Sequence, residues 1–239
     1  MEDQKNNCLV CGAELVYSDQ LMLQQCDFCG LSFEGQAVCE EGHYVCDSCH
    51  AAPAMDIIRK SCLNSKALNP VRLASRIMQH PSVKMHGPEH HFLVPAVLLT
   101  CYYNRCGKRD LLEEKLRQAE KRSSCVPGGF CGSHGNCGAA VGTGIFMSLA
   151  TGSTPLSTDG WRQSNLITAE ALRSVALHGG PRCCKRDTFI SLGEAIDFIE
   201  KELGVSLEKE DRIRCGFSHL NKQCLHEECQ YYDQHLNRA

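Results

Sequence analysis

Seven of the first forty-nine residues are cysteine, and their spacing is that of metal ligands. They form three Cys-x-x-Cys pairs and one looser pair of a cysteine and a histidine, in chain order Cys8 and Cys11, Cys26 and Cys29, Cys39 and His43, and Cys46 and Cys49. Two residues between the cysteines of a pair let both sulfurs reach one metal ion from a single tight turn. Eight such ligands suffice for two tetrahedral sites, so we predict that this segment binds two zinc ions.

The spacing does not determine which of these four pairs share a metal ion. In an interleaved arrangement, the first and third pairs share one metal ion and the second and fourth share the other. In a consecutive arrangement the ligand set is the same, but neighbouring pairs are partners. His50 is a substitute ligand, although a solvated side chain after the last pair is the simpler interpretation. Because so short a segment has little hydrophobic core, we expect metal binding to supply much of its folding free energy.

A glycine-rich stretch later in the sequence carries Cys125, Cys131, His134 and Cys137 and runs directly into a segment of small residues. Glycine lets the backbone approach a ligand closely, and the first turn of a helix offers free N–H groups to an anion or to cluster sulfides. We interpret this stretch as part of a ligand site. The alternative is close packing of a glycine-rich helix against a neighbouring helix.

Cys183 and Cys184 are adjacent in the sequence, with Arg182 before them and Lys185 and Arg186 after them. These positive charges, and the N-terminus of a helix entered at Pro181, predict lowered pKa values for both thiols and a larger thiolate fraction. The two cysteines are therefore the first candidates for a cluster ligand or a sulfur-carrying nucleophile, with Lys185 or Arg182 as an anion-binding residue. The alternative is one buried thiol beside an incidental one.

Cys215, Cys224 and Cys229 lie near the end of the sequence at a spacing that is too wide for a zinc knuckle. Three thiolates at this spacing fit a [4Fe–4S] cluster, whose corners lie further apart than the bonds to a single ion. Zinc with His219 or His226 as the fourth ligand is the alternative. We expect these cysteines to converge on one cluster with either the glycine-rich stretch or the adjacent cysteine pair.

Residues 85–91 contain three histidines and a glutamate. Glu89 and His90 stand at the expected start of a helix and are candidates for proton transfer or for supporting a metal ligand. His90 and His91 point in different directions from a helix, so both cannot serve one site. The alternative roles are helix capping and packing in the core.

The rest of the sequence has to position these groups, and its periodicity is helical from Pro53 onward. Apolar residues at helical spacing predict helices in 55–62, 71–78, 89–104, 110–121, 138–150, 161–177 and 195–203. The last of these follows a sequence at 191–194 that resembles a capping box. Short strand-like sequences, at 14–17 and 31–33, separate the first metal ligands. We therefore predict a small zinc-ribbon or knuckle module, residues 1–52, followed by a mainly α-helical, cysteine-rich domain, residues 53–239.

The length, charge and composition of the chain argue against several classes of function. A length of 239 residues suits one small and one medium domain, and a formal net charge of −3 gives no electrostatic case for nucleic acid as a partner. An RNA-binding zinc ribbon is disfavoured because Lys5 is the one lysine or arginine in residues 1–52. The first residues form no apolar signal segment, and the longest apolar stretch, 92–99, is too short to cross a membrane. We therefore expect a cytoplasmic protein, in a compartment where clustered cysteines indicate metal or redox chemistry.

Four segments together resemble one prokaryotic family: MHGPEHHFLVPAVLL, CGSHGNCGAAVGTGIF, GGPRCCKR and the closing three cysteines. The chain resembles the family catalogued as domain of unknown function 5714, which is typical of anaerobes and methanogens. The resemblance extends over nearly the whole chain, including the knuckle module. It implies relatives that are joined to a methyltransferase-like domain or lie beside radical-SAM proteins. The stretch that begins at Cys137 also resembles the helix after a cluster cysteine in iron–sulfur serine dehydratases.

We therefore expect a cytosolic metalloprotein with two structural zinc ions and a [4Fe–4S] cluster. Three cysteine ligands would leave one iron open as a Lewis acid, which permits desulfuration, sulfur transfer or dehydration of a small-molecule or sulfur-carrying substrate. The cluster ligands come from seven candidates: Cys131, Cys137, Cys183, Cys184, Cys215, Cys224 and Cys229. The alternative is a non-enzymatic accessory protein that carries metal, sulfur or electrons to a radical-SAM or methyltransferase partner.

Overall fold

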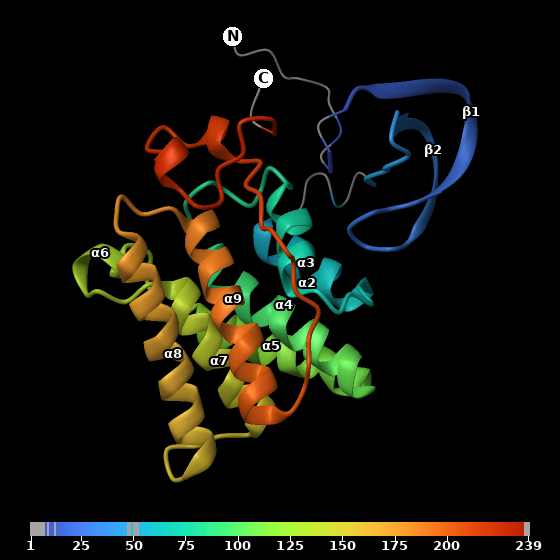
Figure 1. Cartoon of the computed structure of the whole chain (residues 1–239). Coiled ribbons are helices and arrows are strands. Elements are labelled where there is room, and N and C mark those ends of the chain that lie inside the picture. Colours follow the sequence, from blue (N-terminus) through green and yellow to red (C-terminus); the bar gives the residue numbers. More distant parts are fainter. Residues whose placement is uncertain (1–7, 9, 12, 47–48, 50–52, 237–239) are drawn as a thin grey trace.

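A computed structural model describes residues 8, 10–11, 13–46, 49 and 53–236, which form a β-hairpin region beside a bundle of helices (Figure 1). The strands are β1, Leu15–Gln25, and β2, Ser32–Cys39. The α-helices are α2, Ala54–Asn64; α3, Pro70–Met78; α4, Glu89–Cys106; α5, Leu112–Ser123; α6, Phe130–Ser133; α7, Gly138–Thr151; α8, Asp159–His178; and α9, Cys184–Leu203. Short 3-10 helices occur at η1, Arg109–Leu111; η2, Ser218–Leu220; and η3, His226–Glu228. The predicted fold class is confirmed: a cysteine-rich region with small antiparallel strands precedes a mainly helical domain.

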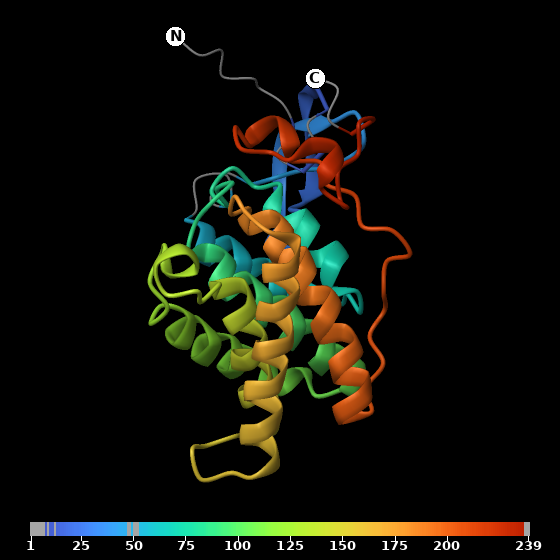
Figure 2. The ribbon, with the colours of Figure 1, turned by 60° about the vertical axis from the view of Figure 1, so that its left-hand side comes forward.

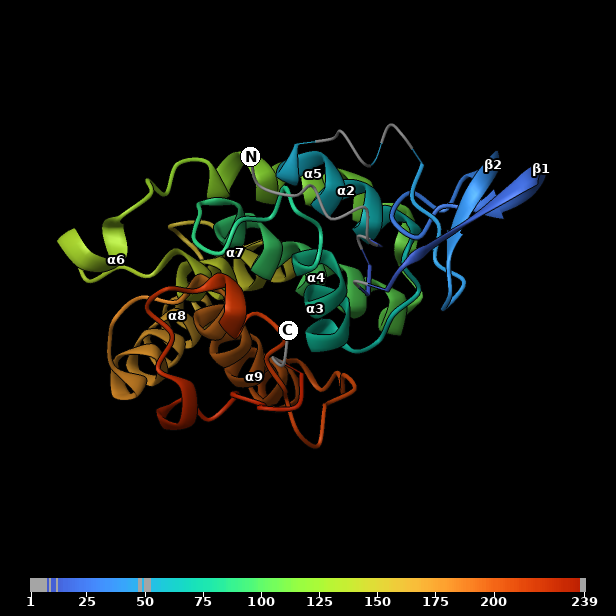
Figure 3. The ribbon, with the colours of Figure 1, turned by 90° about the horizontal axis from the view of Figure 1, so that it is seen from above.

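The first cysteine pairs lie at the two ends of the β1–β2 hairpin. The strands pair antiparallel, and Leu15 lies opposite Cys39 at the open end. At the closed end, Gly30 has a φ of 69°, a conformation that favours glycine, and its N–H donates to the carbonyl oxygen of Cys26. The hairpin therefore carries one cysteine pair in its turn and brings the end of β2 beside the residues that precede β1. Figure 3 shows it projecting from one side of the helical bundle.

Helix α4 is the centre of the helical domain, and it packs against α2, α3, α5, α7 and α9. It is interrupted by Pro95, which has no N–H to donate to the carbonyl oxygen of His91 one turn earlier. Ser123 of α5 replaces that donor, because its hydroxyl donates to the His91 carbonyl oxygen at 3.0 Å. A proline is thus accommodated in a buried helix by a side chain of the neighbouring helix.

Glycines of α7 allow α4 and α8 to approach it closely. A Cβ at Gly142 would lie 2.8 Å from Cδ of Pro95, and a Cβ at Gly138 would overlap the imidazole of His91. On another side, a Cβ at Gly144 would overlap a threonine hydroxyl of α8. Real Cβ atoms do not approach other atoms so closely, so these positions accept little besides glycine. Close packing, the alternative to a ligand site, accounts for the glycines of this helix.

The chain returns from the end of α9 to its beginning (Figures 1 and 2). An extended segment runs back beside α3, where Arg72 and Glu210 form an ion pair. Residues 215–232 then lie over the first turns of α9, and the rings of Phe189 and Tyr231 meet edge to face with their centres 5.5 Å apart. This return brings the last three cysteines beside those that begin α9.

The start of α9 differs from the prediction. The helix begins at Cys184, so the sequence at 191–194 lies inside it and does not cap it. Cys183 is the capping residue, and its sulfur accepts a hydrogen bond from the N–H of Arg186 at 3.5 Å. Ser191 is buried within the helix instead. In the part of the chain that the structure describes, no helix has both the length and the apolar character needed to cross a membrane.

Replacing Gly142 by alanine should lower the free energy of unfolding by about 1–3 kcal/mol, because the new methyl group overlaps the Pro95 ring. The matched control is Gly193→Ala in α9, where a Cβ meets nothing within 4 Å. The control should raise stability by about 0.5–1 kcal/mol, because alanine favours a helix over glycine. Thermal unfolding followed by circular dichroism measures both. Equal effects of the two substitutions would contradict the packing role of Gly142.

Candidate metal centres

The first group of ligands joins the residues before β1 to the end of β2. Its ligand atoms all lie within 4.8 Å of one another, and it consists of Cys8, Cys11, Cys39 and His43. The Sγ atoms of Cys11 and Cys39 are 3.7 Å apart, and Sγ of Cys39 is 3.3 Å from Nδ1 of His43. Thiolates at about 2.3 Å from a tetrahedral zinc ion are about 3.8 Å apart, so this group can hold one metal ion.

The second group joins the hairpin turn to the residues that follow β2. Its ligand atoms also lie within 4.8 Å of one another, and it consists of Cys26, Cys29, Cys46 and Cys49. Each of these side chains is at most 5% exposed. The Sγ atoms of Cys29 and Cys46 are 3.8 Å apart, again the edge of a tetrahedral site. This group can hold a second metal ion.

The ligand pairs are therefore interleaved. Pairing of Leu15 with Cys39 brings the first and third pairs together at the open end of the hairpin. At the turn, the N–H of Asp27 donates to the carbonyl oxygen of Tyr44, and Oδ2 of Asp27 accepts from the Tyr44 N–H at 2.9 Å. These contacts place the second and fourth pairs side by side. The substitute ligand His50 lies outside the described residues.

Backbone N–H groups point at several of these sulfurs. The N–H of Val10 donates to Sγ of Cys8 at 3.3 Å, and the N–H of His43 donates to Sγ of Cys39 at 3.2 Å. Such bonds stabilise a thiolate. At Cys39, burial opposes ionisation, but hydrogen bonds from the backbone and from neighbouring ligands outweigh it and lower the pKa to about 7. At Cys11, burial dominates and raises the pKa to about 11.

The second group is anchored to the end of α3. Nε2 of His80 donates to the carbonyl oxygen of Cys49 at 2.9 Å, and the His80 ring meets the ring of Phe28 edge to face. Nη2 of Arg76 donates to the carbonyl oxygen of Asp27 at 2.6 Å and also contacts its carboxylate. These contacts fix the hairpin turn against the helical domain.

Four further cysteines line one small pocket over the first turns of α9. One comes from the start of α9 and three from the C-terminal segment: Cys183, Cys215, Cys224 and Cys229. The remaining wall combines aromatic side chains, among them Phe189, Phe217 and Tyr231, with polar ones that include Arg186 and Asn221. The volume of about 20 Å³ is far below the roughly 300–1,000 Å³ of small-molecule sites. The pocket as it stands is therefore too small for an organic substrate.

The sulfurs around this pocket also accept backbone hydrogen bonds. Cys215 accepts from the N–H of Phe217, and Cys224 accepts from the N–H of His226, both at 3.4 Å. The donor lies two residues after the cysteine, as it does at Cys8. Among the described residues, only the two N-terminal groups bring three or more ligand atoms within 4.8 Å. The sulfurs of this pocket are thus spread more widely than ligands around a single ion.

The other predicted cluster ligands lie outside this pocket. The thiol of Cys184 forms its backbone hydrogen bond at Gly87, in the loop before α4. Cys137 precedes α7, and its Sγ is 4.0 Å from Oδ2 of Asp187. Cys131 lines a separate cavity of about 490 Å³ between α6 and the end of α8. The adjacent cysteines that begin α9 are therefore split between two environments.

The prediction of lowered pKa values for the adjacent thiols is wrong. Burial raises the pKa of Cys183 and raises that of Cys184 to about 11. The neighbouring cations are engaged elsewhere: the ammonium of Lys185 donates to two backbone carbonyl oxygens, and Nε of Arg186 donates to Oδ1 of Asp187 at 3.1 Å. Although these cations are close to Cys183 and Cys184 in the sequence, their side chains are not directed at the two sulfurs.

Glu89 and His90 support the loop before α4 and do not line the cysteine pocket. Oε1 of Glu89 accepts from the N–H of Lys84 at 2.7 Å, and its carboxylate occupies the space where a Cβ at Gly87 would lie. Nδ1 of His90 donates to the carbonyl oxygen of Gly87 at 3.2 Å. Burial lowers the pKa of His90 to about 3, so its imidazole is neutral. These contacts agree with the alternative role of core packing, whereas α4 has no side-chain cap.

A second cavity borders the cysteine pocket at Cys229. It has a volume of about 480 Å³, and its lining includes Arg212, Arg214 and His235 as well as Asp233. Sequence analysis did not connect these residues with the cysteines, because their spacing carries no motif. They come together only where the C-terminal segment folds over α9.

Comparison with curated proteins and with solved structures gave no match. One family model, described as a family of unknown function (DUF5714), matches residues 58–232. The match includes α3 to α9 and the four cysteines of the small pocket, but it begins after both N-terminal ligand groups. The expected resemblance over the knuckle module is therefore not part of the match. Because the matched residues make up most of the chain, the protein belongs to the DUF5714 family.

Proposed function

We propose that this chain is an iron–sulfur protein in which two zinc ions stabilise the N-terminal region and a [4Fe–4S] cluster occupies the cysteine pocket over α9. The cluster ligands would be Cys183, Cys215, Cys224 and Cys229. One observation carries the proposal: two segments distant in the sequence bring these four thiols to one small pocket.

The spread of the four sulfurs and the hydrogen bonds to them support a cluster over a single ion. Thiolates that bind a cubane lie further apart than thiolates that share one ion, and these four cysteines form no group as close as the N-terminal ones. Backbone N–H groups donate to Cys183, Cys215 and Cys224, and hydrogen bonds of this kind stabilise ligand sulfurs and tune cluster potentials.

Four thiolate ligands favour electron transfer over chemistry at an open iron. A fully ligated cluster can change its oxidation state without exchanging a ligand, whereas a Lewis acid needs a free position. Cys224 and Cys229 are partly exposed, so a cluster here lies near the surface where a partner can dock. We therefore favour the accessory role, in which the protein carries electrons to a radical-SAM or methyltransferase partner.

A second candidate is the lyase or sulfur-transfer activity expected for an open iron. It is favoured by one observation, that Cys229 lines both the cysteine pocket and the larger polar cavity. With Cys229 displaced from its iron, that iron would face the cavity. Arg212 there would bind an anionic substrate, whereas Arg214 is paired with Asp233 at 3.3 Å.

The N-terminal ligand groups suit zinc best. Both are four-coordinate groups of thiolates or of thiolates with one imidazole, and their sulfur separations fit tetrahedral geometry. Neither group keeps an open position, which is the pattern of a structural site. Zinc would hold the hairpin turn and the end of β2 against the helical domain.

The anaerobically purified chain should contain two zinc ions. Cys39→Ala and Cys46→Ala should each leave one zinc ion, because a structural site rarely keeps its metal with three protein ligands. Cys125→Ala, at an exposed thiol outside both groups, is the control and should leave two. Elemental analysis by mass spectrometry gives the counts. If Cys39→Ala and Cys46→Ala both retain two zinc ions, these ligand sets are wrong.

The adjacent cysteines offer a matched test of the cluster. Cys183→Ser should lose iron, sulfide and the broad visible absorption of a thiolate-bound cluster, because Cys183 lines the pocket. Cys184→Ser should keep all three, because its thiol lies toward Gly87. Absorption spectra and iron analysis of anaerobic protein decide between them. Equal loss of iron in both variants would overturn the ligand assignment.

A further inference from the structure

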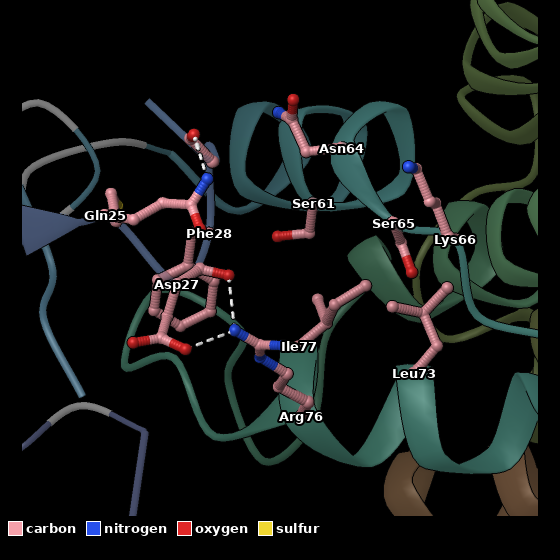
Figure 4. Close-up of a pocket in the computed structure, with 12 residues that line it drawn as sticks. Gln25, Asp27, Phe28, Ser61, Asn64, Ser65, Lys66, Leu73, Arg76 and Ile77 are labelled. Carbon is pink, nitrogen blue, oxygen red and sulfur yellow. Dashed lines mark hydrogen bonds and ion pairs between the residues drawn. The ribbon is translucent and has the colours of Figure 1, made fainter. Parts of the chain in front are cut away.

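A cavity lies where the hairpin turn meets α2 and α3, and Figure 4 shows its lining. Its volume is about 380 Å³, which falls within the range of small-molecule sites. Phe28 of the turn and Leu73 and Ile77 of α3 form an apolar wall. Most of the other lining residues are polar, and Cys26 of the second metal group also borders the cavity. We infer that this cavity binds a small organic anion, a site separate from the cysteine pocket.

The first observation is a buried hydroxyl group that lacks a partner. Ser61 of α2 is 7% exposed, and its Oγ has no hydrogen bond among the described residues. Figure 4 shows its side chain directed into the cavity. A serine hydroxyl in a helix can bond the carbonyl oxygen four residues earlier, but this one does not. A buried hydroxyl without a partner is destabilising, and a hydrogen bond to a ligand atom would offset that cost.

The second observation is a surplus of positive charge. The carboxylate of Asp27 is fully used, because Oδ1 pairs with Arg76 and Oδ2 accepts from the N–H of Tyr44. Arg76 uses Nη2 for these contacts, and its Nε and Nη1 have no partner among the described residues. Nζ of Lys66, at the rim, likewise has no partner there. These free cationic donors match a carboxylate or a phosphate.

The positions of the lining side chains indicate how a ligand would lie in the cavity. In Figure 4 Lys66 and Arg76 lie on opposite sides of the cavity, so the charged end of the ligand would lie against Arg76, and Lys66 would attract it from the rim. The body of the ligand would contact Phe28 and Ile77. A polar atom of the ligand would reach Ser61. The cavity is walled by the turn that carries the second metal group and by two helices of the bundle. A bound anion would therefore contact both regions of the protein.

Isothermal titration calorimetry of the full, zinc-loaded chain with benzoate and with phenyl phosphate tests the inference. At least one of these anions should bind saturably, and benzyl alcohol should not, because it lacks the charge. Lys66→Gln should weaken binding about twofold to fivefold, as expected for an exposed charge pair. Ser61→Ala should weaken it about threefold to tenfold, through loss of one buried hydrogen bond. Lys121→Gln in α5, outside the cavity, is the charge control and should change nothing.

Thermal unfolding of the ligand-free variants excludes misfolding as the cause. Ser61→Ala should be at least as stable as the parent, because it removes an unsatisfied hydroxyl. Saturable binding of either anion that is weakened in both variants supports the site, and the better probe identifies the charged group. No saturable binding of either anion, equal binding of benzyl alcohol, or unchanged affinity in both variants overturns it. The iron content does not enter these outcomes, so the test is independent of the proposed cluster.

Discussion

The buried ammonium group of Lys185 joins the segments on which the cysteine pocket depends. Nζ donates to the carbonyl oxygens of Met78, at the end of α3, and of Val83, in the following loop, at 2.9 and 3.0 Å. It also lies 4.7 Å from the ring centre of Phe217 in the C-terminal segment. Burial lowers the pKa of Lys185 to about 8, and these contacts offset part of that cost. Because Lys185 joins these segments, the cysteines of the first turn of α9 and of the C-terminal segment lie around one pocket.

The sequence predicted the fold class and the two N-terminal groups that could hold metal ions, because both depend on local patterns. Two-residue spacing between cysteines and the helical period of apolar residues act within one turn or one helix. The partners of the ligand pairs could not be predicted. They depend on the register that places Leu15 opposite Cys39 and on the contacts between Asp27 and Tyr44, which join separate parts of the chain.

The predictions for the helical domain failed where neighbours in sequence are not neighbours in space. Lys185 follows two cysteines, yet its ammonium is directed into the core and leaves the thiols to the effect of burial. The glycines of α7 indicate a close neighbour, but only the structure shows that it is α4, with His91 and Pro95. The cavity beside Ser61 has no signal in the sequence, because two regions form it together.

Helix α3 lies between the hairpin turn of the second candidate metal group and the first turn of α9. Residues at its C-terminal end hold the hairpin turn through His80 and the first turn of α9 through Met78. The central claim is that the pocket over α9 holds a [4Fe–4S] cluster while the N-terminal groups hold zinc. The Mössbauer spectrum of the full chain, produced and kept without oxygen, tests this most directly. It should show four irons per chain with the signature of a cubane, in protein that also contains two zinc ions. Protein that contains zinc alone, with no iron signal, would contradict the account.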